Sequence, residues 1–343
     1  MRFICLDILI GKRRSIGMVQ FLPITDVYAR EIFDSQGNPA IEVEVVAGEN
    51  CLGKAQAASG AWKNNVKEAI VFVNDTIARE LMDVNVFSQN EIDKILYKLN
   101  EEKWEEKAAV SMKYVVSVAA ARSASQAMDL PLYRYLGGVN GRKLPIPMIY
   151  IASSGKRNAG HGHIRSFMVI PVGAKEFSEA IKMCIQVHHE VRKMEEKNGE
   201  LPTTDEHGGI IFKGKDEEIL ESLKKAARNA GYEPGKELHF VVNCSAMENA
   251  VWIRPNRIGT ISYAMDNIRD AQKEGKVVIL AQEVGETEDT FIADLSVAMG
   301  CDLIKLGAPG RMENVAKYNR LLEIEEKLGE YAEFSSFCSR ISG

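Results

Sequence analysis

The sequence predicts an α/β protein in which a small α+β domain is followed by a larger domain of alternating strands and helices. Strict alternation of apolar and polar residues at Ile41, Val43 and Val45 predicts a half-buried strand near the N-terminus. Farther along, short apolar runs alternate with amphipathic segments, which is typical of a parallel β/α barrel or of a doubly wound sheet. The 343 residues, 45% of them hydrophobic, suffice for two domains and exclude a disordered chain.

The first domain is predicted to open with a β-hairpin and is placed at residues 23–142. Its first strand includes Ile24, Val27, Ala29 and Ile32, and Asp34–Asn38 has the composition of a turn before the second strand. The further elements expected in this domain are a strand at 51–55 and helices at 66–81 and 106–128.

Residues 1–22 are predicted to form an extension outside the fold. Met1–Leu9 is apolar, but the basic residues Lys12–Arg14 follow it, the reverse of the order in a secretory signal. Met18 stands just before the first patterned segment. We therefore expect either a disordered arm or a wrongly assigned start codon.

The second domain is placed at residues 143–343 and is predicted to contain six strands. These strands are expected at 146–151, 167–171, 239–243, 251–254, 277–281 and 303–306. The helices between and after them are expected at 174–197, 216–230, 261–274, 289–298 and 312–328. A closed β/α barrel uses eight strands and about 250 residues. The domain is therefore too short for a complete barrel.

Composition excludes several classes of protein. The net charge of −5 and the lack of a long basic stripe disfavour nucleic-acid binding. No apolar run reaches the roughly 18 residues that cross a bilayer, so we expect no membrane partner. The six cysteines are scattered without a CxxC pair, which indicates reduced thiols and a cytoplasmic location. The glycine pairs lack the spacing of a nucleotide-binding loop.

Seven segments, in order along the chain, together resemble the enolase family (phosphopyruvate hydratase). They are ITDVYAREIFDSQGNPAIEVEV from Ile24, LPLYRYLGG from Leu130, FMVIPVGA from Phe167, RPNRIGT from Arg254, GETEDTFIADL from Gly285, IKLGAPGR from Ile304 and AKYNRLL from Ala316. The resemblance implies an α+β cap domain, an eight-stranded barrel with the active site at the strand C-terminal ends, and a homodimer. It also implies the Mg²⁺-dependent dehydration of 2-phosphoglycerate to phosphoenolpyruvate in glycolysis, by a base and one or two Mg²⁺ ions that stabilise an enediolate.

The catalytic positions of the family carry other residues in this chain. The position of the general base is Arg254, and a guanidinium cannot give up its proton in a protein. The position of the general acid is His207 if the loop aligns without a gap, or Glu206 if it slips by one residue. A supporting glutamate of the family corresponds to Ser166.

The metal positions are also altered. The first metal-binding aspartate of the family corresponds to Asn243, an amide in place of a charged hard ligand. The other two metal carboxylates lie in the family on two strands between the segments that here read SAMEN (residues 245–249) and RPNRIGT (from Arg254), and in this chain only residues 250–253 separate them. Two β/α units need roughly 60 residues. We therefore predict that two units of the barrel are missing, and that Mg²⁺ is not bound with normal affinity.

The substrate-holding positions follow the same trend. The family sequence Ser-His-Arg-Ser before GETEDT is here Ala281, Gln282, Glu283 and Val284, so an anion stands where a phosphate should dock. The loop histidine of the family corresponds to Arg157, and Lys305 alone keeps the family residue. A set of cations formed by Lys305, Arg157, Arg165 and Arg254 could still bind an anion. His161, His163 and His207 could form a new zinc or nickel site.

These substitutions predict a catalytically impaired or inactive family member with a binding or regulatory role. It would form a homodimer or a hetero-oligomer with an active enolase subunit, and it could bind a phosphorylated small molecule. The alternative is a Mg²⁺-dependent hydratase or altered lyase with residual activity, using His207 or Glu206 as acid or base and Lys305 and Arg254 as anion binders. A decayed gene product is the third possibility.

Overall fold

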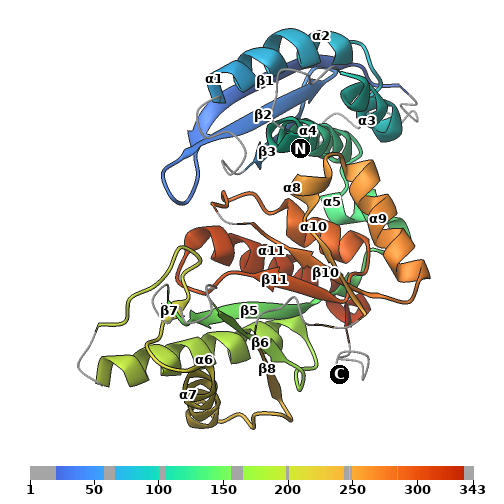
Figure 1. The fold of residues 1–343 in the computed structure, drawn as a ribbon. Coiled ribbons are helices and arrows are strands. Elements are labelled where there is room, and N and C mark those ends of the chain that lie inside the picture. The colour runs from blue at the N-terminus through green and yellow to red at the C-terminus, as the bar shows by residue number, and fades with distance from the viewer. Residues whose placement is uncertain are drawn as a thin grey trace, which may run out of the picture.

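The computed structural model describes residues 21–57, 66–99, 106–155, 165–197, 201–242, 247, 249–283 and 285–335. Within these ranges the chain forms a small sheet covered by helices and a larger sheet surrounded by helices, with the first lying above the second in Figure 1. None of the helices in these ranges is both long and apolar enough to span a membrane.

The first sheet contains the predicted hairpin. Strands β1 (Ile24–Phe33), β2 (Pro39–Ala47) and β3 (Cys51–Ala57) pair antiparallel in that order. The Asp34 carboxylate closes the β1–β2 turn, because its Oδ1 accepts hydrogen bonds of 2.8 Å from the backbone N–H groups of Gln36 and Asn38.

Helices cover one face of this sheet (Figure 1). The predicted helix 66–81 is present as α1 (Val66–Phe72), the π-helical turn η2 (Val73–Ile77) and α2 (Ala78–Leu81), and it is followed by α3 (Gln89–Lys98) and α4 (Glu106–Ala127). Helix α4 packs directly on β3 at Gly53, where an added Cβ atom would lie 1.9 Å from the carbonyl oxygen of Ala119. The amide of Asn74, in the π-helical turn, accepts from the backbone N–H of Ala29 on β1 at 2.6 Å.

The second sheet has seven strands and the order β8-β6-β5-β11-β10-β9, with β7 paired to β5. The strands are β5 (Ile146–Ser153), β6 (Ser166–Pro171), β7 (Ile210–Ile211), β8 (Leu238–Val242), β9 (Ala250–Ile253), β10 (Val277–Ala281) and β11 (Leu303–Leu306). The helices around it are α5 (Leu132–Gly137), α6 (Phe177–Lys197), α7 (Asp216–Asn229), α8 (Pro255–Ile258), α9 (Ile261–Lys273), α10 (Phe291–Ala298) and α11 (Met312–Leu328). Two single 3₁₀ turns, η3 (Gly138–Asn140) and η5 (Gly329–Tyr331), lie next to the short pair β4 (Lys143–Leu144) and β12 (Glu333–Phe334).

The sheet is mixed and agrees with the predicted β/α architecture, with one strand that runs against its neighbours. Strands β9, β10, β11 and β5 are parallel, but β6 is antiparallel to both of its neighbours, β5 and β8. Only residues 154–165 connect β5 to β6, which is too short for the usual crossover with a helix and its two loops. The missed strand β7 has only two residues, and such a short segment has no detectable periodicity.

The sheet does not close into a barrel. Strands β8 and β9 follow one another in the chain with only residues 243–249 between them, yet they lie at opposite ends of the strand order. No pairing joins these two strands in the part of the chain that the structure describes. The predicted shortage of barrel strands is therefore seen as an opening between β8 and β9.

The alternation of side chains divides the core of this domain in two. Residues on the inner face of the sheet form one cluster, namely Ile146, Met148, Tyr150, Met168, Ile170, Val277, Ile279, Leu303 and Ala308. Residues on the outer face pack under the helices, for example Val278 and Ile304. Along β5 and β10 every residue is buried, whereas Phe240, Val241 and Trp252 on the two edge strands are only half-buried. The opening thus leaves apolar side chains partly exposed.

The cap and the barrel domain are joined by buried polar contacts. The Arg122 guanidinium of α4 binds both carboxylate oxygens of Asp289, at 2.6 and 2.8 Å, and Asp289 also accepts the backbone N–H of Gln56 at 2.9 Å. Burial alone would raise the pKa of Asp289, but Arg122 outweighs it and holds that pKa below its ordinary value. From the cap, Asp93 and Ser117 also accept the first two backbone N–H groups of α9. These contacts fix the barrel loops that follow β9 and β10.

We predict that His188, on α6, makes the protein less stable in acid. Its side chain is 7% exposed and neither ring nitrogen has a hydrogen-bond partner among the described residues. Burial is the main cause that lowers the pKa of His188 to about 4. Below the ordinary pKa of about 6.5, unfolded chains bind a proton that the folded protein refuses, so the free energy of unfolding should fall between about pH 6.5 and pH 4, by up to about 3 kcal/mol.

Urea denaturation of His188→Leu across this pH range measures the effect. The variant should lose a large part of the decline, whereas His189→Leu, at the neighbouring exposed position, should retain it. An unchanged pH slope in His188→Leu would show that another group causes the loss.

Candidate active site at the strand ends

A cavity of about 570 Å³ lies at the carboxyl end of β5 and β11. Tyr150 and Ser153 of β5, Ser166 and Met168 of β6, and Lys305 of β11 form one side of it. Gly155, Asp205, Glu206, His207 and Ile211 complete its lining. Its size suits a small organic ligand.

The loop 205–209 is held against the cavity by one carboxylate. Asp205 Oδ1 accepts the backbone N–H groups of His207 at 2.9 Å and Gly209 at 3.0 Å, and Oδ2 accepts the Tyr150 hydroxyl. Gly209 is required for this approach, because an added Cβ atom would lie 2.3 Å from the Tyr150 ring. Burial, and then the charge of Asp205, raise the pKa of Tyr150 far above its ordinary value, so this hydroxyl remains a donor.

His207 and Glu206, the two alternatives for the acid position, both line the cavity. The His207 ring is half-buried and packs edge-on against Tyr150, with the ring centroids 5.5 Å apart, whereas Glu206 is exposed. Burial, and then the positive charge of Lys305, lower the pKa of His207. The imidazole is therefore neutral at neutral pH, a state in which it can accept a proton.

Arg254 and Glu283 form an ion pair. Arg254 directly follows β9 and Glu283 lies two residues after β10, and the Nε–Oε1 distance between them is 2.9 Å. Arg257 binds the other oxygen of the same carboxylate at 2.6 Å, and the Glu283 side chain is only 14% exposed. The three side chains have a summed charge of +1, two positive and one negative. None of them lines the large cavity.

The Gln282 side chain is buried and hydrogen-bonded within the protein. It is 6% exposed, and its Nε2 donates to Asn314 Oδ1 of α11 at 2.7 Å. Asn314 in turn donates to the carbonyl of Ala308 at 2.9 Å. This chain of bonds ties the end of β10 to the loop after β11.

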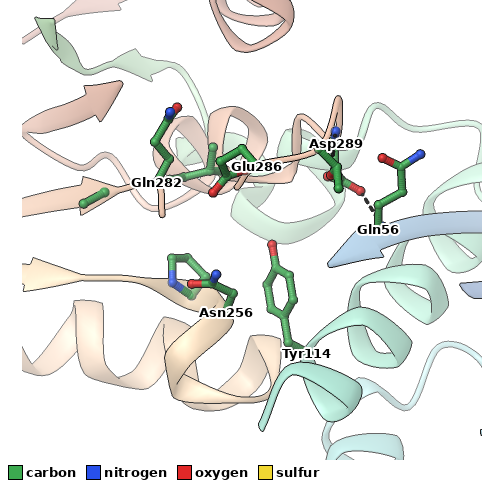
Figure 2. A pocket seen from close by; sticks show the side chains of 10 residues that line it. Gln56, Tyr114, Asn256, Gln282, Glu286 and Asp289 are labelled. Carbon is green, nitrogen blue, oxygen red and sulfur yellow. Dashed lines mark hydrogen bonds between the residues drawn. The ribbon is translucent and has the colours of Figure 1, made fainter. Parts of the chain in front are cut away.

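A second cavity of about 30 Å³ lies between the cap and the barrel domain (Figure 2). Figure 2 shows Tyr114 of α4 pointing towards the segment that carries Gln282 and Glu286, with Asn256 beside it. Asp289, on the same segment, accepts a hydrogen bond from the backbone N–H of Gln56 on the cap strand β3. The volume admits a water molecule and not a substrate. Burial raises the pKa of Tyr114 well above its ordinary value, so its hydroxyl stays protonated here.

The structure thus brings His207, Glu206, Ser166 and Lys305 to one cavity and places Arg254, Glu283 and Gln282 outside it. Arg157 and Asn243 lie outside the described residues, as do His161 and His163 of the suggested zinc or nickel site. Arg165, from the suggested cation set, pairs with Asp216 at 3.0 Å.

Sequence reasoning missed three residues that shape the cavity, Tyr150, Ser153 and Asp205. Tyr150 and Ser153 are the only residues with hydroxyl groups on the otherwise apolar strand β5, and this contrast could have marked them as candidates. Asp205 lies three residues before Gly208-Gly209, and an aspartate at the start of such a loop commonly accepts the backbone N–H two residues further on, here that of His207.

The described residues do not fit a magnesium site. They contain no group of three or more histidine, cysteine, aspartate or glutamate side chains arranged to hold a metal ion. Lys305 lines the cavity, and its charge opposes a cation there.

Two family models match the chain. The model of the enolase C-terminal TIM barrel domain matches residues 142–248 and again residues 236–340, and the model of the enolase N-terminal domain matches residues 62–136. The two matches to the barrel model meet at residues 236–248, which include β8 and most of the connection to β9. This is the place where the sheet is open.

We predict that Glu283→Gln converts the ion pair into an anion site. Removal of the carboxylate leaves Arg254 and Arg257 without their shared partner, so one more unit of positive charge faces solvent. Because both arginines are substantially exposed, a unit charge about 4 Å away contributes about 1 kcal/mol, which corresponds to roughly fivefold tighter phosphate binding. Titration with inorganic phosphate at low salt, followed by thermal shift, measures this.

The control is Asp270→Asn, which removes the acidic partner of an exposed pair with Lys273 on α9. It should leave the response to phosphate as in the unaltered protein. An identical phosphate response in Glu283→Gln and the unaltered protein would mean that the ion pair does not block anion binding.

Proposed function

Because the chain belongs to the enolase family, we propose that it is a member that does not dehydrate 2-phosphoglycerate and acts by binding. Its role would be regulatory, as a homodimer or in a hetero-oligomer with an active enolase subunit. The Arg254–Glu283 ion pair supports this proposal most directly.

The ion pair argues against two roles that Arg254 would need to fill, that of a general base and that of a cation facing the substrate. Proton abstraction beside a carboxylate requires a base, and Arg254 stays protonated and is held by a carboxylate. A developing dianion is stabilised by cations that face it, but the Glu283 carboxylate forms ion pairs with both Arg254 and Arg257. The geometry favours a stable internal pair over a reactive site.

We also propose weak binding of Mg²⁺ and a cytoplasmic location. With Asn243 at the first ligand position and no fitting set of carboxylates in the described ranges, Mg²⁺ would bind more weakly than in a competent family member. The free thiols of Cys51, Cys184 and Cys301 agree with a reducing, cytoplasmic setting.

The second candidate function is an altered lyase with residual activity. The observation in its favour is that His207, with a lowered pKa, lines a cavity together with Lys305 and Glu206. A neutral imidazole beside a lysine can accept a proton from a bound acid. In this case His207 or Glu206 would serve as acid or base and Lys305 as the anion binder.

Conversion of 2-phosphoglycerate to phosphoenolpyruvate, assayed with excess Mg²⁺, separates the two functions. We expect no turnover above the buffer blank from the full chain. Turnover that falls about 100-fold or more in His207→Asn, with the fold retained, would overturn the proposal and establish the lyase. Turnover that His207→Asn leaves unchanged would also overturn it, and would assign the chemistry to other residues.

A further inference from the structure

The large cavity is lined by polar groups that do not match a highly charged ligand. Among the described residues that line it, Lys305 is the cation, and Asp205 and Glu206 are acids. Of the nearby arginines, Arg165 pairs with Asp216, and Arg311 lies behind the lining and donates to the carbonyl of Asp205 at 2.9 Å. The described lining therefore has no excess of positive charge.

A buried hydroxyl gives independent evidence that the cavity is built for a polar ligand. Ser153 is 1% exposed and lines the cavity, and its Oγ makes no hydrogen bond of standard geometry with any described residue. Its polar neighbour is the Tyr150 hydroxyl, which already donates to Asp205. A buried hydroxyl without a well-aligned partner is destabilising, and a ligand hydroxyl or carboxylate at this place would satisfy it.

The remaining walls limit the ligand further. Met168, Ile211 and the ring of Tyr150 contribute apolar surface, and Ser166 adds a second hydroxyl. Glu206 is an acceptor at the rim. These groups match a small molecule with one carboxylate for Lys305 and hydroxyls for the serines and Glu206.

We infer that this cavity binds a small hydroxylated carboxylic acid that carries a single negative charge, in preference to a phosphorylated one. The inference rests on the proposed binding function and names its ligand class. A phosphoryl group would add nearly two negative charges to a cavity lined by Asp205 and Glu206, and repulsion between like charges would weaken its binding.

Glycerate and 2-phosphoglycerate are the matched probes, since they differ only in the phosphoryl group. We would titrate the full chain with each, without Mg²⁺ and at fixed ionic strength, by isothermal titration calorimetry. We expect glycerate to bind at least tenfold more tightly than 2-phosphoglycerate. Tighter binding of 2-phosphoglycerate, or no binding of glycerate, would overturn the inference.

Two variants locate the binding. Lys305→Met should weaken glycerate binding at least tenfold and Ser153→Ala about fivefold. Lys273→Met and Ser178→Ala, at exposed positions on α9 and α6, should leave it unchanged. Unchanged glycerate binding in Lys305→Met would overturn the inference.

A measurement on the unaltered protein covers the case in which a variant fails to fold. The ring protons of His207, assigned by NMR, should shift on addition of glycerate, whereas those of the remote His188 should not. No shift at His207 would overturn the inference. These results are independent of the turnover assay. A failure to bind glycerate would not contradict the proposal that 2-phosphoglycerate is not turned over, and turnover would overturn that proposal without deciding which ligand binds more tightly.

Discussion

The short connection between β8 and β9 is the constraint on which the rest of the barrel domain depends. With only residues 243–249 between them, the chain passes from one end of the strand order to the other without adding strands. The sheet stays open, and apolar side chains on both edge strands are half-buried. This opening is also where the two matches to the enolase barrel model overlap, at residues 236–248.

The open sheet still presents strand ends that support a site, but their chemistry has changed. Parallel strands β9 and β10 bring Arg254 and Glu283 together, and the two charges neutralise one another. The two central strands, β5 and β11, supply Ser153 and Lys305 to the cavity, which His207 of the loop 205–209 also lines. The contacts of Arg122 and Asp93 from the cap keep the loops after β9 and β10 in place. A binding function at this cavity needs only the central strands and that loop.

Local pattern predicted the elements well where periodicity is strong. The bounds of β10, β11 and α11 agree with those expected from the sequence, because each is an uninterrupted apolar or amphipathic run. The antiparallel direction of β6 could not be predicted from its own residues, since direction depends on the connection and the pairing partner. The Tyr150–Asp205 contact joins residues 55 positions apart that share no motif. The Arg254–Glu283 pair could have been anticipated, because both follow neighbouring parallel strands and carry opposite charges.

We propose that the protein does not remove the C2 proton of 2-phosphoglycerate, because Arg254 stays protonated and is paired with Glu283. The most direct measurement is exchange of the C2 hydrogen of 2-phosphoglycerate for deuterium in D₂O with Mg²⁺, followed by NMR, since exchange reports proton removal even when elimination fails. We predict exchange no faster than in the same buffer without protein. Exchange that depends on protein concentration would contradict the account, and its loss in Lys305→Met or His207→Asn would identify the group responsible.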